Sequence, residues 1–359
     1  MLPALLSDDL PRSRVVGLLL IAIVVMLAIV PFAFGGAKAM SVAAKVMVFV
    51  LLVASYDLLL GYTGIVSFAH TMFFGIGAYG ISIASTRMGA GWDAIGLGLV
   101  CALLVAGLLA LAIGLFSLRV KAIFFAMITL AVASAFQTLA SQLPGLTGGE
   151  DGQSFRVPAV LRPSFTWFEI ESLGVEVGGR VLGYYLVFVV VLVSFLALMR
   201  VVNSPFGRVL QAIRENDFRA EAIGYRTVVF RTLSNVIGAM FAAIAGALYA
   251  IWVRYNGPDT TLAFEIMLDI LLIVVIGGMG TMYGAVIGSA LFLVAQSYLQ
   301  DVLAWVGGLL HAVPLAAELF SAERWLLWLG LLFVLSVYYF PSGIVGRLRL
   351  AAFARAKRD

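Results

Sequence analysis

The chain has 359 residues, of which 63% are hydrophobic and only 12% are charged. Soluble domains carry about a quarter charged residues, so this composition excludes a soluble globular protein and indicates a multi-pass protein of the lipid bilayer. The net charge of +4 does not indicate nucleic-acid binding, because the basic residues flank apolar segments instead of forming one patch.

Taken in chain order, about ten apolar segments are long enough to cross a bilayer as helices. They cover residues 15–34, 41–60, 64–85, 93–118, 122–142, 181–199, 228–253, 262–276, 284–300 and 325–340. The third, eighth and ninth contain enough glycine to be broken or re-entrant. We therefore predict an all-α polytopic membrane protein in which residues 1–359 form one transmembrane domain.

The distribution of basic residues predicts the orientation of the spans. When the N-terminus is placed inside and successive spans alternate, most of the 23 Lys and Arg residues fall on the inner side. Because inner loops carry an excess of Lys and Arg, both termini are predicted to be cytoplasmic. Residues 143–180 then form a periplasmic loop, and residues 203–226 lie on the cytoplasmic side.

Residues 203–226, NSPFGRVLQAIRENDFRAEAIGYR, predict a short amphipathic helix between two apolar spans. Ser204 can cap a helix that has Pro205 in its first position, and Gly224 is a natural stop. Charged residues fill most of the surface left by the apolar positions, which are Phe206, Leu210, Ile213, Ala220 and Ile223. The segment is either a surface shown to a partner or a charged loop that only anchors two spans.

Motifs for phosphate binding, nucleophilic catalysis and metal binding are absent from the sequence. The pair Gly-Lys never occurs, which excludes a phosphate-binding loop, and no G-x-S-x-G motif exists. His70 and His311 are the only histidines, and neither has Cys or His partners at ligand spacing. We therefore predict no enzyme activity, cofactor or metal. Uphill transport would draw its energy from another chain or from an ion gradient.

Two glycine-interrupted segments, 61–70 and 277–284, mark a predicted solute pathway, and each follows an apolar helix with one aspartate. Paired interruptions point to a pathway because unwound backbone offers free N–H and C=O groups to a polar solute. The alternative is tight helix packing with turns. The candidate pathway residues in and before these segments are Asp57, Gly61, Gly64, Ser67, His70, Asp269, Gly278, Gly280 and Thr281.

Three further features leave two interpretations open. Asp269 is expected near mid-membrane, where it is either functional or paired, for example with Arg254. His70 is either a hydrogen-bonded structural residue or part of a proton relay. The turn containing Gly148 and Gly149 either only reverses the chain direction or forms an entrance whose backbone N–H groups bind an arriving solute.

The chain resembles the permease subunits of branched-chain amino-acid ABC importers in six stretches. They are residues 61–80, 124–131 (FFAMITLA), 147–152 (TGGEDG), 205–224, 246–250 (GALYA) and 277–284 (GGMGTMYG), and they extend from the second predicted helix to the ninth. Stretches 124–131 and 147–152 resemble the M-type permease and not its H-type sister.

This resemblance implies a bacterial inner-membrane complex of two different permeases, two cytoplasmic ATPase subunits and a periplasmic solute-binding protein that docks near residues 148–152. It also implies that 205–224 is a coupling helix held by an ATPase. The coupling residues implied are Phe206, Arg208, Arg214, Glu215, Asn216, Glu221 and Gly224. The expected solutes are branched-chain or other amino acids, ahead of urea, amides and small carboxylates.

Two other function classes compete with this interpretation. A stand-alone channel or ion-coupled carrier would use Asp269 and His70 as coupling groups and would need no ATPase. An intramembrane enzyme would need paired catalytic groups, which the sequence lacks.

Overall fold

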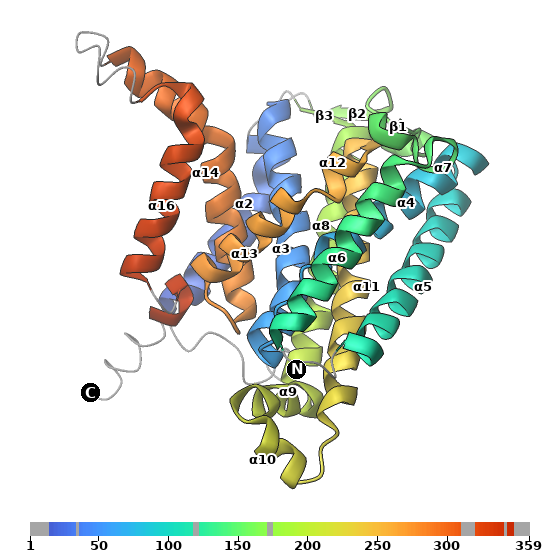
Figure 1. The fold of residues 1–359 in the computed structure, drawn as a ribbon. Helices are drawn as coiled ribbons and strands as arrows, with labels where there is room; N and C mark the ends of the chain where they lie inside the picture. The colour runs from blue at the N-terminus through green and yellow to red at the C-terminus, as the bar shows by residue number, and fades with distance from the viewer. Residues whose placement is uncertain are drawn as a thin grey trace, which may run out of the picture.

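A computed structural model of the chain describes residues 14–33, 36–117, 122–170, 175–309, 320–340 and 343–347. This part is almost entirely helical, and its long helices lie side by side in a bundle (Figure 1). The ten long helices are α2 (Arg14–Ala33), α3 (Ala37–Thr63), α4 (His70–Met88), α5 (Trp92–Ser117), α6 (Ala122–Ser141), α8 (Gly179–Asn203), α11 (Thr227–Val253), α13 (Phe264–Gly277), α14 (Met282–Leu309) and α16 (Trp325–Tyr339). Each coincides with one predicted span.

Within the described residues, nine helical segments are long and apolar enough to cross a membrane. Helix α4 is outside that set because it is less apolar, yet most of its residues are buried among other helices. The predicted polytopic all-α fold is therefore confirmed. Residues 1–13 and 348–359, which include the predicted cytoplasmic termini, and His311 lie outside the described residues.

The short elements gather at the two ends of the bundle (Figure 1). One end, here the α9 side, carries α9 (Pro205–Glu215) and α10 (Asp217–Ala222). The other, the strand side, carries α7 (Pro144–Thr147), η1 (Gly149–Asp151), β1 (Gln153–Ser154), η2 (Ala159–Leu161), β2 (Thr166–Ile170), β3 (Val175–Gly178), β4 (Tyr255–Asn256) and α12 (Pro258–Thr261), with η3 (Ala322–Arg324) before α16. Strands β1 and β4 pair antiparallel, as do β2 and β3.

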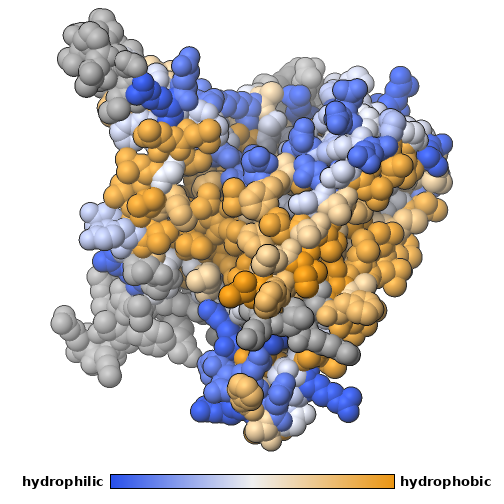
Figure 2. All heavy atoms as spheres, in the orientation of Figure 1, coloured by the Kyte–Doolittle hydropathy of each residue, from blue (hydrophilic) through white to orange (hydrophobic). Residues whose placement is uncertain are grey.

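Helix α3 forms the centre of the bundle. It is apolar on all sides, which is typical of a helix enclosed by others, and it packs against α8, α11, α13 and α14. The outer helices α2, α5, α6 and α16 keep many apolar side chains exposed. Figure 2 shows the result as an apolar band across the middle of the molecule, with hydrophilic atoms at the two ends. Such a band can face the hydrocarbon core of a bilayer, because the helices behind it satisfy their own backbone hydrogen bonds.

The predicted breaks are present, but they lie between helices. Residues 64–69 are non-helical and separate α3 from α4, while residues 278–281 separate α13 from α14. Helices α4 and α14 run without a break through Gly75, Gly77, Gly284 and Gly288, so the third and ninth spans are not themselves broken. The eighth predicted span is continuous as α13 and follows the short helix α12. Its 14 residues cover only about 21 Å of a roughly 30 Å hydrocarbon core.

Helices α4 and α11 pack closely because glycines line their contact. A Cβ atom at Gly246 of α11 would overlap the carbonyl oxygen of Phe74, and one at Gly77 of α4 would overlap the carbonyl oxygen of Ala243. Small residues allow such backbone contact, which lets van der Waals packing associate helices where lipid removes the hydrophobic driving force.

Gly246→Ala is therefore expected to destabilise the protein by about 1–3 kcal/mol, because the added methyl group forces α11 away from α4. Gly107→Ala on α5 is the matched control, since nothing lies within 4 Å of a Cβ atom there. Thermal unfolding of the purified chain in detergent measures both. Equal unfolding midpoints for the two variants would show that the α4–α11 contact tolerates a side chain.

Candidate functional site

Three elements meet on the α9 side in a junction formed by Asp57 and Gly61 of α3, Arg214 of α9 and Gly280 between α13 and α14. The Gly280 N–H donates to the Asp57 carboxylate at 2.9 Å. The Arg214 guanidinium donates to the Gly61 carbonyl oxygen. Asp57 is 2% exposed, so its charge has little access to water. The junction therefore ties α9 to the end of a central helix and to a helix break.

Glycine is needed at two positions of this junction. A Cβ atom at Gly61 would overlap both the Asp57 carboxylate and the Gly280 nitrogen, which would break their hydrogen bond. Gly280 has φ +77°, a left-handed conformation that side chains rarely adopt, and a Cβ atom there would lie 2.8 Å from the Arg214 guanidinium. The two predicted glycine segments thus contact each other directly, through Gly61 and Gly280.

The ends of the two helices at the junction are closed by local hydrogen bonds. Gly64 has φ +73° and terminates α3, and the following Ile65 N–H donates to the Leu59 carbonyl at 3.2 Å. At the second break, the Thr281 hydroxyl donates to the Gly278 carbonyl at 2.7 Å. Neither break leaves a long unpaired stretch of backbone facing lipid.

Ser67 and His70 lie at the buried start of α4. The Ser67 hydroxyl accepts from the Ala69 N–H at 3.3 Å. His70 Nε2 lies 2.8 Å from the Ser55 hydroxyl, whose own proton goes to the Leu52 carbonyl at 2.7 Å. Nε2 must then carry the proton and donate to Ser55. His70 therefore has a hydroxyl and not an acid as its hydrogen-bond partner, which suits a structural tie between α4 and α3.

Gly148 and Gly149 lie at the opposite end, on the strand side. The Gly149 N–H donates to the Thr147 hydroxyl at 3.2 Å, and the Thr147 hydroxyl lies 2.5 Å from the Ala140 carbonyl at the end of α6. The neighbouring Asp151 accepts through its carbonyl from the Tyr255 hydroxyl at 2.8 Å, and its side chain is exposed. The structure thus divides the predicted pathway residues between the junction, the start of α4, the strand side and α13.

The predicted partner of Asp269 is wrong. Asp269 accepts from the Gln296 side chain of α14 at 3.3 Å, whereas Arg254 donates to the Leu161 carbonyl at 3.4 Å on the strand side. Burial, and then the nearby Arg180, lowers the pKa of the Arg254 guanidinium, the opposite of what pairing with an acid would produce.

Residues 203–226 were predicted to form one amphipathic helix, but they contain two helices, α9 and α10. Asn216 is extended between α9 and α10, and its side chain caps α10 by accepting from the Arg219 N–H at 2.9 Å. Ser204 precedes Pro205 as predicted, but its hydroxyl donates back to the Val201 carbonyl at 2.6 Å and caps nothing. The competing local hydrogen bonds of Ser and Asn explain both differences.

The buried face of this segment follows the predicted apolar pattern except at its end. Leu210, Ile213 and Ala220 are buried, and Phe206 stacks on Phe230 of α11. Ile223 is 67% exposed, contrary to prediction, because α10 ends before it.

The outward face differs from the predicted set of charged residues. Arg214 is directed to Gly61, and Glu221 accepts from the Thr227 hydroxyl at 2.7 Å. Phe218 is 85% exposed beside Ile223, a feature that sequence reasoning missed although an aromatic residue within a charged run could have indicated it. Gly224, with φ +97°, turns the chain back towards α11. The exposed residues of this segment that make no contact described above include Arg208, Glu215, Phe218 and Ile223.

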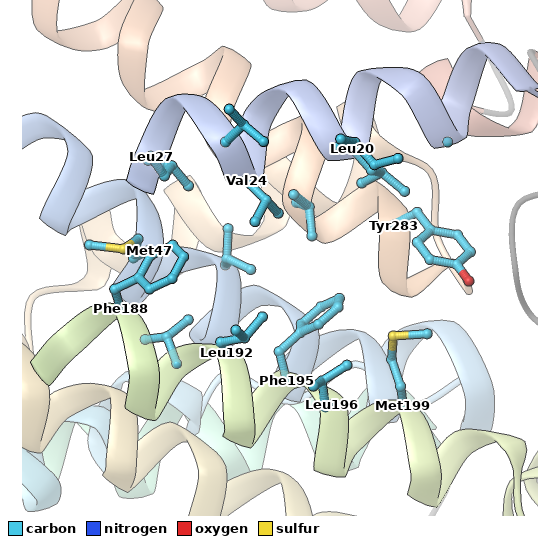
Figure 3. A pocket seen from close by; sticks show the side chains of 16 residues that line it. Leu20, Val24, Leu27, Met47, Phe188, Leu192, Phe195, Leu196, Met199 and Tyr283 are labelled. Carbon is cyan, nitrogen blue, oxygen red and sulfur yellow. The ribbon is translucent and has the colours of Figure 1, made fainter. Parts of the chain in front are cut away.

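A separate groove of about 410 Å³ lies between α2, α3, α8 and α14 (Figure 3). Side chains such as Val24, Met47, Phe188 and Phe195 line it, and the hydroxyl of Tyr283 lies at one end. An apolar lining suits lipid chains and cannot pair the polar groups of a charged solute. The groove is therefore not a candidate solute site.

Comparison with known proteins agrees with this architecture. Residues 38–337 match the family model described as the permease component of the branched-chain amino acid transport system. No solved structure matches the chain.

Named relatives match across most of the chain. The high-affinity branched-chain amino acid transport system permease protein LivM of Escherichia coli is 25% identical, over 92% of this chain and 75% of its own length. The probable LivM of Methanocaldococcus jannaschii is 26% identical, over 79% of this chain and 80% of its own. The E. coli permease protein LivH is 24% identical, over 83% of this chain and 91% of its own.

The family match, its extent and the relatives agree with the resemblance that the sequence motifs carry. The chain belongs to the family of permease components of branched-chain amino acid transport systems.

Proposed function

We propose that this chain is the permease subunit of an ATP-driven importer and forms half of an alternating-access pathway for amino acids. The observation that carries the proposal is the junction, which joins α9 to the end of α3 and to the break between α13 and α14. A displacement applied to α9 from outside the membrane would reach both glycine segments without passing through flexible chain.

The outward face of α9 and α10 supports docking of a separate ATPase. Phe218 and Ile223 are largely exposed, and the charged side chains of Arg208 and Glu215 on the same segment are exposed as well. Exposed apolar residues with a polar rim are typical of protein–protein contact sites. The chain has no phosphate-binding loop of its own, so ATP hydrolysis is assigned to the partner.

The charge distribution supports the orientation. Arg200, Arg208, Arg219 and Arg226 are exposed on the α9 side, which fits a cytoplasmic location in a bacterial inner membrane. The strand side exposes Glu150 and Asp151, which belong to the loop of residues 143–180. We assign this side to the periplasm and to contact with a solute-binding protein.

A second permease is proposed to cover the face formed by α6 and α13. Ser134 and Thr138 of α6 and Glu265 of α13 are exposed within helices that otherwise face lipid with apolar side chains. Polar groups at membrane depth usually face a partner or a water-filled cavity. The names LivM and LivH, carried by relatives of this chain, denote two permeases of one kind of system.

The channel or carrier alternative is less well supported. Its two coupling groups have different hydrogen-bond partners, since His70 contacts Ser55 and Asp269 contacts Gln296. These contacts do not join them in one proton relay.

Phe218→Ala is expected to weaken ATPase binding about tenfold or more, because a largely exposed aromatic side chain at the centre of a contact site contributes strongly. Phe116→Ala on α5 is the matched control, since Phe116 is 81% exposed within the apolar band. The amount of ATPase that co-purifies with each variant measures binding. If the same amount of ATPase co-purifies with both variants, the docking site lies elsewhere.

Arg214→Ala is expected to leave ATPase binding intact and to lower both solute uptake and solute-stimulated ATP hydrolysis about tenfold, because a charged hydrogen bond to the Gly61 carbonyl is lost. Arg208→Ala, on the outward face of the same helix, should instead weaken docking. Assays of the reconstituted importer separate the two effects. Undiminished solute-stimulated hydrolysis in Arg214→Ala would refute transmission through the junction.

A further inference from the structure

A second polar cluster, separate from the junction, connects three helices in the half of the bundle nearer the strand side. Lys45 of α3 donates to the side-chain oxygen of Gln296 of α14 at 3.3 Å. The Gln296 side-chain nitrogen donates in turn to the Asp269 carboxylate of α13 at 3.3 Å. An amide thus stands between a positive and a negative side chain, both partly buried in membrane-spanning helices.

This arrangement is unlike a purely structural ion pair. Two turns before Lys45 on α3, Lys38 contacts Asp301 of α14 directly at 2.5 Å, at the exposed rim. Lys45 and Asp269 are in contrast held apart by the amide and keep unused hydrogen-bonding capacity, since an ammonium has three donors and a carboxylate about four acceptor sites. Charges within a membrane are costly, and groups kept only partly paired there are candidates for binding a solute.

The cluster lies near polar surface at the strand side. Glu265 is exposed one turn before Asp269 on the same face of α13. Figure 2 shows hydrophilic surface extending from the strand side into the upper part of the front face, where Figure 1 places α12 and the start of α13. A polar solute entering from this side would reach Glu265 before Asp269.

We propose that Lys45 and Asp269 bind the two charged ends of a zwitterionic α-amino acid, and that the Gln296 amide occupies their positions in the empty state. The amide carries its donor and acceptor on one carbon, and an α-amino acid carries its ammonium and carboxylate on adjacent carbons. The solute ammonium replaces the amide N–H at Asp269, and the solute carboxylate replaces the amide oxygen at Lys45. The inference rests on the proposed function, because it requires a solute pathway along α13.

Charge balance sets the specificity of this site. Lys45 and Asp269 together are neutral, and a zwitterion is neutral, so the exchange adds no net charge to the membrane interior. A simple amine or a simple carboxylate would leave one partner unmatched and one uncompensated charge, which is strongly disfavoured at low dielectric. The site therefore selects amino acids over amines and small carboxylates.

The test uses the full-length chain in lipid nanodiscs. Its thermal unfolding midpoint is measured at increasing concentrations of leucine, 3-methylbutylamine or 4-methylpentanoate, at equal ionic strength. A ligand of the folded state raises the midpoint with concentration. Leucine is expected to stabilise the wild-type chain, and the two singly charged analogues are not. Lys45→Met and Asp269→Asn should each raise, about tenfold, the leucine concentration that produces a given increase in the midpoint.

Controls separate recognition from structure. Lys38→Met removes the rim ion pair and should leave the leucine response unchanged, while Lys45→Arg should restore the response that Lys45→Met loses. Gln296→Leu removes the competing amide but keeps both charges, so leucine should act at equal or lower concentration. A wild-type chain that responds no more to leucine than to the analogues, or a Lys45→Met chain that responds like wild type, would overturn the proposal. If the proposed importer function itself is wrong, no ATPase will co-purify with the wild-type chain, and this result is independent of the leucine response.

Discussion

The structure depends on a backbone contact that only glycine permits. At Gly61 the missing side chain lets the Gly280 N–H reach Asp57, while the Gly61 carbonyl accepts from Arg214. A buried carboxylate, a helix end and a surface helix are thereby held in one place. Because Asp57 is almost fully enclosed, losing the Gly280 N–H would remove a hydrogen bond from a buried carboxylate, which is costly at low dielectric. The contact is therefore stable, and movement of α9 has to carry it along.

Helix α3 takes part in three polar contacts inside the bundle. It contributes Lys45 in the half nearer the strand side, Ser55 to His70, and Asp57 and Gly61 to the junction on the α9 side. The rest of α3 is apolar and buried on every side, so it behaves as a rigid element between these clusters. A shift of its end at the junction is accordingly transmitted along the helix towards Lys45. This gives a physical connection between the surface proposed to face an ATPase and the groups proposed to hold a solute.

Much of this arrangement could be predicted from local sequence, and the failures have identifiable causes. The ten apolar segments became helices because their length and composition admit no other membrane-compatible structure. Glycine also marked both breaks, although it could not show that Gly61 and Gly280 touch, since that contact joins residues far apart in the chain. Arg214 looked like an outward residue because helical periodicity does not say that a long side chain reaches back to a neighbouring helix. The Asp269 partner was misassigned for the same reason: Gln296 is uncharged, and nothing in its sequence context marks it as a partner of Asp269.

The claim that α9 and the α13–α14 break move as one body can be measured directly. In a Cys101→Ser background, spin labels at Gln211→Cys of α9 and Met279→Cys would report their separation in the assembled importer with and without ATP. A second pair, at Gln211→Cys and Leu139→Cys of α6, would report motion of α9 relative to the outer helices. If α9 and the break move together, the 211–279 distance stays constant while the 211–139 distance changes. A 211–279 distance that changes on ATP binding would contradict this claim.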